Sequence, residues 1–387
     1  MSSLRVERIE SAEALAALRP EWQRLAAAHG GGLPFATWEW SSVWWAHFRE
    51  RNLGVHDRLF ARAIRSASGE LLGVAPLMLT ERPGVGPVRV RTLQFLGADP
   101  NVTELRGVLC DPAHEREVYA ALLAHLRACG DEWDWMIWLG MREGSPAARL
   151  LGKQPNFSWV RSFPDFVLRP KGTWEDFKSS RSRNIKESLR KCYNSLKRDG
   201  HDFTFTVARS RAEVAQGLDV FLRLHGARAQ QDSGVQHSNV FASINARGFL
   251  AEICQRMAEH DQVRLFQLRI GGEVVATRIG FALGKALYLY YSGYDPEWGR
   301  YSVMTTTVAE SLKHAIHEGF ELINLSTGND VSKTRWSPEE LTYCEGIHLS
   351  ETLRARAAWS AYHKAREVLE DERTRSVAQR LLGRRSK

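Results

Sequence analysis

The residues that could do chemistry begin with a loop between an aromatic strand and a helix. Residues 288–320 read YLYYSGYDPEWGRYSVMTTTVAESLKHAIHEGF, and a helix is expected from Ser302, as its N-cap, to the glycine at 319. A helix start carries unpaired N–H groups and a partial positive charge, so it can bind an anion. Gly299 and Arg300 lie just before the helix, so this segment is a candidate phosphate site. The alternative interpretation is an ordinary loop with one exposed arginine, which the same residues would also fit.

A second group of candidates could bind an anionic substrate or move a proton. Arg183 lies on a basic stripe of the helix expected over residues 181–198, which is either a solvated face or a landing surface for an anion. His225 and Arg228 share a helix face, and a histidine there could act as a general base or simply pack. Lys333 belongs to a polar segment after a strand, where α/β proteins commonly contact ligands.

Other chemical motifs are missing from the sequence. It contains no serine-nucleophile elbow, no Walker loop and no ligand spacing typical of a metal site, so we expect no metal. The five cysteines form no CxxC pair, and their odd number predicts free thiols in a reducing compartment. Trp40, Trp44 and Phe48 recur at helical spacing, which indicates a core stripe more often than a platform for stacking sugars.

The composition is that of a globular protein with a basic surface. The chain has 387 residues, of which 43% are hydrophobic and 25% charged, enough for two or three domains with sizeable cores. A formal charge of +8 favours an acidic partner, such as a phosphorylated cofactor, an anionic polymer, a nucleic acid or a membrane surface. No apolar run is long enough to span a bilayer and the N-terminus lacks the apolar core of a signal peptide, so we expect a cytoplasmic protein.

The elements that must position these candidates occur in the same order twice. The first half should hold a hairpin, a strand, a helix and a strand, over residues 57–66 and 70–79, 88–97, 115–130 and 133–140. The second half should repeat that order over residues 262–270 and 273–284, 286–295, 302–319 and 320–328, with a tight hairpin turn at Gly271-Gly272. Because the order is shared, we predict two related α/β domains.

This repeat predicts the domain organisation. The boundary should lie in a loop-like stretch between Gly144 and Gly172, which gives an N-terminal domain over residues 1–160 and a C-terminal domain over residues 161–350. Residues 351–387 read as a basic helical tail with a frayed end. The predicted fold class is therefore α/β (α+β).

In order and spacing, these segments resemble the GNAT acyltransferase superfamily, and within it the BioF2-like branch, also called the CelD/BcsL type. The resemblance covers nearly the whole chain. In the first half it rests on PFATWEW, GELLGVAPLML and RTLQFLG. In the second half it rests on FKSSRSRNIKESLRK, LHGAR, GGEVVATRIGF and YYSGYDPEW, and on Gly328, Lys333 and Trp336 of a G…K..W pattern. It implies two tandem GNAT-like domains, each a mixed, largely antiparallel sheet flanked by helices, with a C-terminal helical appendage.

The resemblance also implies where a cofactor and a substrate would bind. One segment would correspond to the loop that binds the pyrophosphate of acyl-CoA, although its later glycines are replaced by larger residues: Gly299, Arg300, Tyr301, Ser302 and Val303. The first half has no comparable loop, so only the second domain is expected to hold acetyl-CoA or another acyl-CoA, and the N-terminal domain is expected to be non-catalytic. The acceptor would lie near Arg183, Arg228 and Lys333.

The activity that this resemblance implies is transfer of an acyl group from acyl-CoA to an amine. The acceptor would be an amino sugar or a sugar nucleotide of exopolysaccharide or cell-envelope biosynthesis. Strands 286–295 and 320–328 would splay so that backbone N–H groups hold the thioester oxygen. Asp295 and His225 are the candidate bases, and Tyr294 is a candidate acid for the departing thiolate.

Two other functions stay open at this point. Tandem GNAT-like domains also occur in Fem-type aminoacyl transferases, and the basic helix and tail favour an aminoacyl-tRNA as donor, although no coiled-coil arm is present. The replaced loop glycines instead favour a scaffold without catalysis that binds a partner.

Overall fold

The computed structural model describes residues 4–84, 89–98, 101–231, 238–364 and 367, and its strands form two sheets. The strands of the first half are β1 (Arg5–Ile9), β2 (His56–Leu59), β3 (Ala61–Arg65), β4 (Leu71–Ala75), β5 (Leu77–Pro83), β6 (Arg89–Phe95), β7 (Leu109–Cys110) and β8 (Trp135–Arg142). Those of the second half are β9 (Phe157–Leu168), β10 (Phe203–Ala208), β11 (Val263–Ile270), β12 (Glu273–Leu283), β13 (Ala286–Tyr294), β14 (Leu322–Thr327) and β15 (Glu339–Leu349).

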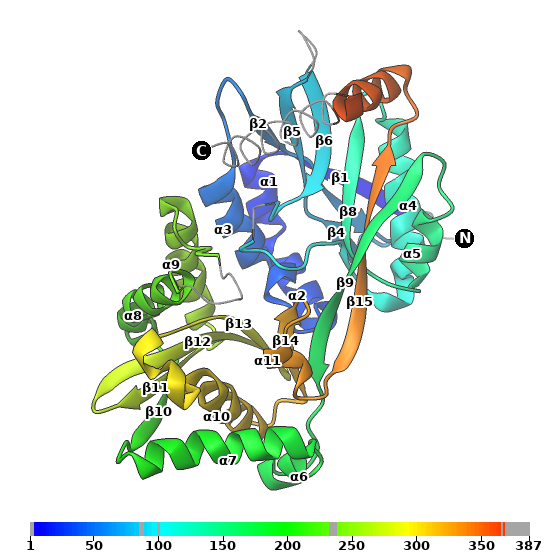
Figure 1. Ribbon diagram of the computed structural model, residues 1–387. Helices are drawn as coiled ribbons and strands as arrows, with labels where there is room; N and C mark the ends of the chain where they lie inside the picture. The colour runs from blue at the N-terminus through cyan, green and yellow to red at the C-terminus, as the bar shows by residue number, and fades with distance from the viewer. Residues whose placement is uncertain (1–3, 85–88, 99–100, 232–237, 365–366, 368–387) are drawn as a thin grey trace, which may run out of the picture.

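Helices cover these sheets on both faces (Figure 1). In the first half they are α1 (Ala12–Ala17), α2 (Arg19–His29), α3 (Trp38–Phe48), α4 (Glu115–Ala128) and α5 (Pro146–Leu151), with short 3-10 helices η1 (Pro34–Ala36) and η2 (Pro112–His114). In the second half they are α6 (Trp174–Ser179), α7 (Arg183–Arg198), α8 (Arg211–Ala229), α9 (Ile244–Ala258), η3 (Pro296–Tyr301), α10 (Val303–His317) and α11 (Val331–Thr334). Residues 353–364 are also helical, and the rest of the predicted tail, apart from residue 367, lies outside the described residues.

The larger sheet has eleven strands and passes through both halves of the molecule. Its order is β10-β11-β12-β13-β14-β9-β15-β8-β6-β5-β2, while β1-β3-β4-β7 form a four-stranded sheet. Most neighbours are antiparallel, and the parallel pairs are β13 with β14 and β6 with β8. The fold is therefore mixed α/β with large sheets flanked by helices, which confirms the predicted fold class.

The first predicted hairpin is divided between the two sheets. The strands expected over 57–66 and 70–79 are each interrupted, at Phe60 and at Pro76, so that β3 pairs with β4 in the small sheet and β2 pairs with β5 in the large one. Proline has no N–H to donate to a ladder, which explains an interruption at that position. The second hairpin stays in one sheet, and its turn places Gly271 and Gly272 at positive φ as predicted.

The junction between the halves is built from strands, where a loop was expected. Residues 146–151 form α5 because Ser145 caps the helix and Pro146 takes its first position. β9 then follows, and the predicted boundary at residue 160 falls inside it. β9 pairs with β14 of the second half, and β15 pairs with both β9 and β8 of the first half. The two halves are therefore joined within one sheet, because β15 of the second half pairs with β8 of the first half.

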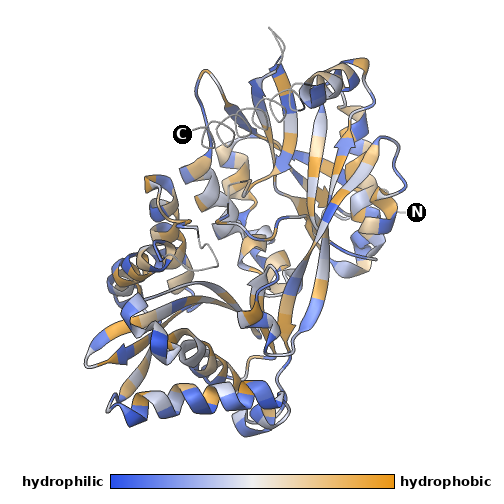
Figure 2. Cartoon of the chain, viewed as in Figure 1, coloured by the Kyte–Doolittle hydropathy of each residue, from blue (hydrophilic) through white to orange (hydrophobic). Residues whose placement is uncertain are grey.

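The main core also joins the two halves. The predicted aromatic stripe forms α3, where Trp40 and Trp44 are buried, so the stripe is core and not a sugar platform. The Trp40 ring contacts Phe249 and Tyr290 of the second half, with ring centroids 5.0 and 5.8 Å away. The cartoon coloured by hydropathy shows apolar residues gathered along strands and inner helix faces (Figure 2). Burial of this aromatic surface stabilises the arrangement of the two halves.

Several local predictions are confirmed. Thr173 and Asp176 form a capping box at α6, and Gly200, which follows the end of α7, has positive φ. All five cysteines are free thiols.

Two further findings concern the described part of the chain alone. No helix in it is long and apolar enough to cross a membrane, and no group of His, Cys, Asp and Glu side chains in it could hold a metal ion.

Candidate active site

The site begins where β13 and β14 separate. The two strands are paired in parallel only from Ala286–Leu322 to Tyr288–Asn324, and beyond these residues they diverge. β13 also carries a β-bulge opposite Ile279, because two residues, Tyr290 and Tyr291, stand against one on β12. A cavity of about 560 Å³ opens beyond the separation, and the first turns of α10 line it through Met304, Thr305 and Val308.

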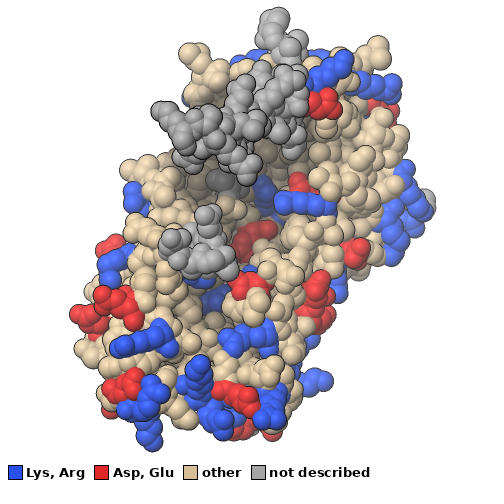
Figure 3. All heavy atoms as spheres, viewed as in Figure 1, with Lys and Arg blue, Asp and Glu red and all other residues tan. Residues whose placement is uncertain are grey.

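The cavity lies between the two halves and is strongly charged. It is visible as a hollow with basic and acidic side chains in the space-filling view (Figure 3). Its basic lining side chains are Arg106, Arg161, Arg228, Arg278, Lys333 and Arg335, and its acidic ones are Glu104 and Asp330. Six cations against two carboxylates favour an anionic ligand.

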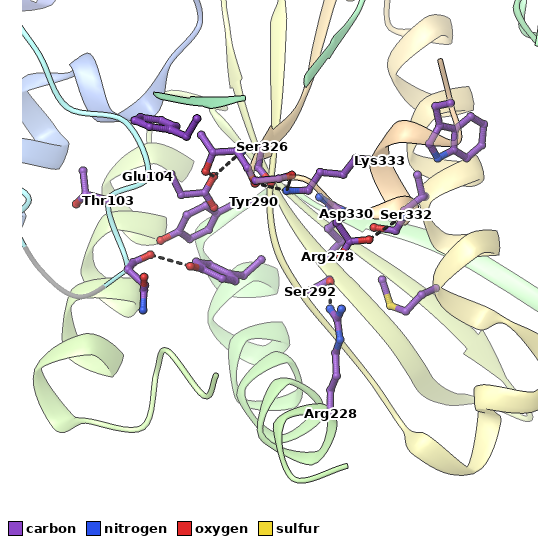
Figure 4. A pocket seen from close by; sticks show the side chains of 18 of the residues that line it. Thr103, Glu104, Arg228, Arg278, Tyr290, Ser292, Ser326, Asp330, Ser332 and Lys333 are labelled. Atoms are coloured by element: carbon purple, nitrogen blue, oxygen red, sulfur yellow. Dashed lines mark hydrogen bonds between the residues drawn. The ribbon is translucent and has the colours of Figure 1, made fainter. Parts of the chain in front are cut away.

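Glu104 is supplied by a loop of the first half. Its Oε2 accepts hydrogen bonds from the Tyr288 hydroxyl of β13 and, at 3.3 Å, from the Thr327 N–H of β14. The carboxylate thus lies at the point where the two strands part, with Lys333 beyond it (Figure 4). Burial raises the pKa of Glu104, although the Tyr288 hydrogen bond and the charges of Lys333 and Arg278 work in the opposite direction.

The loop that carries Glu104 is held on both sides. The hydroxyls of Tyr290 and Tyr291 donate to the carbonyls of Val102 and Asn101, the second at 2.7 Å, and the Trp40 indole donates to Thr103 at 3.1 Å. The loop leaves the site beside β8, where a Cβ on Gly140 would lie 1.9 Å from the Arg106 carbonyl oxygen. Gly140 has a φ of +73°, so glycine is required there both for the backbone conformation and for the close approach.

Lys333 is positioned by the short helix α11. Its Nζ donates to the carbonyls of Thr327 and Gly328. The Asp330 carboxylate caps α11 by accepting from the Ser332 N–H at 2.6 Å. That bond keeps the pKa of Asp330 low although burial opposes it, while burial lowers the pKa of Lys333.

Two arginines form the opposite wall. Arg228, at the end of α8, donates to the Ser292 hydroxyl at 2.9 Å, and Arg278 of β12 donates to the Leu289 carbonyl at 3.1 Å. The Arg278 Nε is buried without a hydrogen-bond partner among the described residues. Burial, and then the nearby Arg228, lower the pKa of Arg278 to about 10. Such closely placed cations are costly to bury and would be stabilised by an anion.

None of the three predicted catalytic residues, His225, Tyr294 and Asp295, lines the cavity. His225 is buried, with its Nδ1 3.0 Å from the Ser292 carbonyl oxygen and its ring stacked on Phe221. The Tyr294 hydroxyl donates to Gln231 at 2.6 Å, and Asp295 caps η3. Their catalytic roles stay predictions.

The predicted phosphate segment is folded more tightly than an open loop. Residues 296–301 form η3, in which Arg300 lies over the Tyr301 ring and the Tyr301 hydroxyl donates to Asp199 at 3.1 Å. Ser302 stands at the start of α10 with a φ of 54°, but its side chain makes no capping hydrogen bond, so this part of the N-cap prediction is wrong. A residue in the left-handed region cannot present its hydroxyl as an extended N-cap does.

The side of α10 that faces the cavity is different. There the Arg335 guanidinium donates to the Thr305 hydroxyl at 3.3 Å and to Ser188 of α7. A helix start beside a guanidinium is a suitable place for a phosphate. Of the residues named for the cofactor, Gly299, Arg300, Tyr301, Ser302 and Val303, none lines the cavity, whereas the next two residues of the chain do.

The predicted acceptor residues are separated in space. Arg228 and Lys333 line the cavity together, as proposed. Arg183 lies at the outer face of α7, where its side chain is 88% exposed and paired with Glu187. It is not a lining residue.

Sequence reasoning missed Glu104, Arg278 and Asp165. Asp165 of β9 is fully buried next to this site, accepts from the Asn324 amide at 2.7 Å, and has a pKa raised by burial to about 6. Arg278 interrupts an otherwise apolar return strand, which was the available signal. Glu104 had no local signal, because only the tertiary structure brings its loop to β13.

Comparisons with known proteins agree with this architecture. Residues 181–334 match the model of the acetyltransferase (GNAT) domain family, and a search of curated proteins found no match. Among solved structures, the crystal structure of FemX is similar with a TM-score of 0.56 at 12% identity, covering 84% of this chain and 95% of that one. A tandem GNAT protein from the clavulanic acid biosynthesis pathway has a TM-score of 0.44 at 11% identity, covering 89% and 98%.

These likenesses concern the fold. The match to the acetyltransferase family includes α7, β13, α10 and β14, the elements that surround the cavity. Residues 181–334 are thus similar to the acetyltransferase (GNAT) domain family, within an α/β fold that is similar to FemX over most of the length of this chain.

Proposed function

We propose that the protein transfers an acyl group from a thioester donor to an amine acceptor, and that the reaction takes place in this cavity. The observation that carries this proposal is the separation of β13 and β14 in front of α10, with a cavity open between them. Separated strands leave backbone groups without partners in the sheet, and such groups can hold a carbonyl oxygen as negative charge develops on it. The match of residues 181–334 to the GNAT acetyltransferase domain supports the same reaction.

The donor we propose is acetyl-CoA or another acyl-CoA. Its diphosphate would bind at the start of α10 on the side of Thr305, where Arg335 adds a guanidinium. The residues of η3 fit a diphosphate less well, since the Asp199 carboxylate lies beside Tyr301 and a negative charge there opposes a phosphate. In this proposal the diphosphate binds to residues that directly follow the segment predicted from the sequence.

The acceptor we propose is an anionic amine, such as an amino sugar phosphate or a sugar nucleotide of exopolysaccharide or cell-envelope synthesis. Arg228, Arg278 and Lys333 face the same cavity and could bind its phosphate or carboxylate groups. A cavity of about 560 Å³ suits a ligand of this size.

A second candidate is a Fem-type reaction in which the donor is an aminoacyl-tRNA. Two observations favour it: the fold is similar to FemX, and η3 takes the place of an open glycine-rich loop. In this case the same cavity and the same acceptor cations would serve an ester donor. Binding of tRNA would then weaken steeply with salt.

Thermal melting with millimolar acetyl-CoA tests the donor. A ligand at 100 times its Kd stabilises the folded protein by about 2.7 kcal/mol, which raises Tm by a few degrees in a chain of this size. We expect Arg335→Ala to abolish the shift and Arg300→Ala, a matched change in η3, to keep it. The reverse pattern would place the diphosphate on η3.

The absence of any shift with acetyl-CoA, longer acyl-CoAs or free CoA would argue against an acyl-CoA donor. Titration with aminoacyl-tRNA at two salt concentrations would then separate the Fem-type reaction from a scaffold that binds neither donor.

A further inference from the structure

We propose that Glu104, contributed by the N-terminal half, is the general base that takes the proton from the acceptor amine. The inference rests on the proposed acyl transfer and changes the expected role of the N-terminal half, from a passive domain to one that supplies a catalytic residue.

Glu104 lies at the point where β13 and β14 separate. Glu104 bridges the two separating strands, because its Oε2 accepts from Tyr288 on β13 and from Thr327 on β14. An acyl carbonyl held between these strands would therefore lie next to this carboxylate, and so would the nitrogen that attacks it.

Glu104 has an oxygen available to accept a proton. The hydrogen bonds that it makes with described residues all fall on Oε2, which leaves Oε1. The other lining carboxylate, Asp330, also uses one oxygen only, to cap α11, but among the described residues it makes no side-chain hydrogen bond to β13 or β14. Asp165 is fully buried and is not a lining residue, so a substrate does not reach it.

The surroundings of Glu104 influence its strength as a base. Four charged or titratable side chains act on it: Tyr288 of β13, Lys333 of α11, Arg278 of β12 and Asp165 of β9. Burial raises the pKa of Glu104, and a higher pKa makes a carboxylate a stronger base. The Tyr288 hydrogen bond and the charges of Lys333 and Arg278 act in the opposite direction, because they favour the ionised form that a base requires.

The reaction balances as follows. The lone pair of the neutral amine forms the new C–N bond at the thioester carbonyl carbon, and the N–H proton passes to Glu104. Collapse of the tetrahedral intermediate breaks the C–S bond, so the sulfur leaves with the electron pair and takes a proton from solvent. Glu104 then releases its proton to solvent. The products are an amide and free CoA.

The fold explains why this residue can come from the other half. Two tyrosine hydroxyls of β13 hold the backbone at Asn101 and Val102, and Trp40 holds Thr103, immediately before Glu104. Such supporting contacts fix a catalytic group within a fraction of an ångström, as a base requires.

The test uses the full-length chain with acetyl-CoA as donor and glucosamine 6-phosphate as acceptor probe, with CoA release followed by a thiol reagent. Glu104→Gln is the decisive variant, since the amide oxygen can still accept from Tyr288 and Thr327. We expect its kcat to fall roughly 10²- to 10⁴-fold, with KM for acetyl-CoA and Tm close to those of the wild-type protein. Glu340→Gln, an exposed glutamate of β15, is the matched control and should behave as wild type.

The pH profile adds a readout that a structural role would not move. In the wild-type protein the rate should rise with pH as Glu104 loses its proton, and Glu104→Gln should lack this limb. A Glu104→Gln protein with wild-type kcat would overturn the inference and leave acyl transfer standing. A wild-type protein that releases no CoA above background would overturn the proposed acyl-CoA reaction, and the role of Glu104 with it.

Discussion

Each half of the chain places a parallel strand pair beside a helix, but the space beyond the pair is used differently. Beyond β6 and β8, three aromatic side chains pack together on the side of α4: the Trp138 ring lies 6.2 Å from Phe95 and 5.9 Å from Tyr119. A hollow of about 180 Å³, lined by Phe95 and Leu139 among others, lies beside them, whereas the charged cavity beyond β13 and β14 has about 560 Å³. We call the first, with its smaller hollow, the closed crossing and the second the open crossing.

The helices that follow β6 and β13, α4 and α10, also differ in the charges at their N-terminal ends. α4 begins with Glu115 and Glu117, whereas the first turn of α10 contains no acid and has Arg335 beside it. Acids at a helix start occupy the favourable position that an anion would take. In the proposed function, the first half is a packed support that also contributes Glu104 to the cavity at the open crossing.

The largest effect should follow from opening the closed crossing. Trp138→Ala removes a fully buried ring between β6, β8 and α4, and we expect it to reduce the free energy of unfolding by about 3–5 kcal/mol. Urea unfolding measures this. Trp159→Ala, at a residue 44% exposed, is the control and should cost far less. Equal losses in the two variants would mean that Trp138 does not support the closed crossing.

Each half also has a buried aspartate near its parallel strand pair, and the two aspartates have different partners. Asp134 of the first half is paired with Arg354 and Arg91, while Asp165 is held by the Asn324 amide. Because the folded-state pKa of Asp165 is raised from 3.8 to about 6, the folded protein binds the extra proton between these values. Its contribution to stability is therefore full below pH 4 and is lost as pH rises through 6, a loss of about 3 kcal/mol.

Asp165→Asn should remove that dependence and raise stability at pH 8, whereas Asp134→Asn should lower it by leaving two arginines without their partner. Denaturant midpoints at pH 4.5 and pH 8 measure both. If Asp165→Asn lowers stability at both pH values, the carboxylate is needed in its ionised form.

Loss of a cavity cation should affect only the open crossing. Arg278→Met is expected to reduce kcat/KM for glucosamine 6-phosphate about 10- to 100-fold, or roughly 1.4–2.7 kcal/mol, because a phosphate would lose a buried guanidinium. The loss should be much smaller for uncharged glucosamine. Arg183→Met, on the exposed face of α7, is the matched control, and a comparable loss there would restore the acceptor role predicted for Arg183.

The smallest effect concerns the contact between the halves. Tyr290→Phe removes one hydrogen bond to the Val102 carbonyl, which should cost about 1 kcal/mol of stability. We also expect a several-fold fall in kcat, since Glu104 follows two residues later. Tyr362→Phe, near the end of the described chain and partly exposed, is a control that should leave kcat unchanged.

The sequence allowed the second half to be predicted well because its signals are local. The hairpin over β11 and β12, the helix α10 and the strand β14 follow from alternation, helical spacing and glycine turns, and their observed bounds differ from the predicted ones by a few residues at most. The division of the first hairpin between two sheets was not predictable in this way, because burial continues across Phe60 and Pro76.

The candidate site could be predicted only in part. Arg228 and Lys333 were identified because Arg228 lies on a helix, and Lys333 follows a strand, that carry clear signals, and both line the cavity. Glu104 was not identified, because its importance depends on tyrosines nearly 190 residues away in the chain. Long-range contacts of this kind leave no periodic trace in a sequence.

The pairing of β9 with β15 has a mechanical consequence. These strands pair from Phe157–His348 to Val167–Glu339, with one register shift between Glu345 and Gly346, and form a hydrogen-bonded ribbon that joins the two halves. Two halves joined by a flexible linker can move apart as rigid bodies. Two halves that share a long pair of hydrogen-bonded strands can only twist slightly about those strands. Ligand entry and release must then rely on small movements of side chains and short loops. The turnover rate should accordingly depend little on solvent viscosity, in contrast to enzymes whose lobes must close.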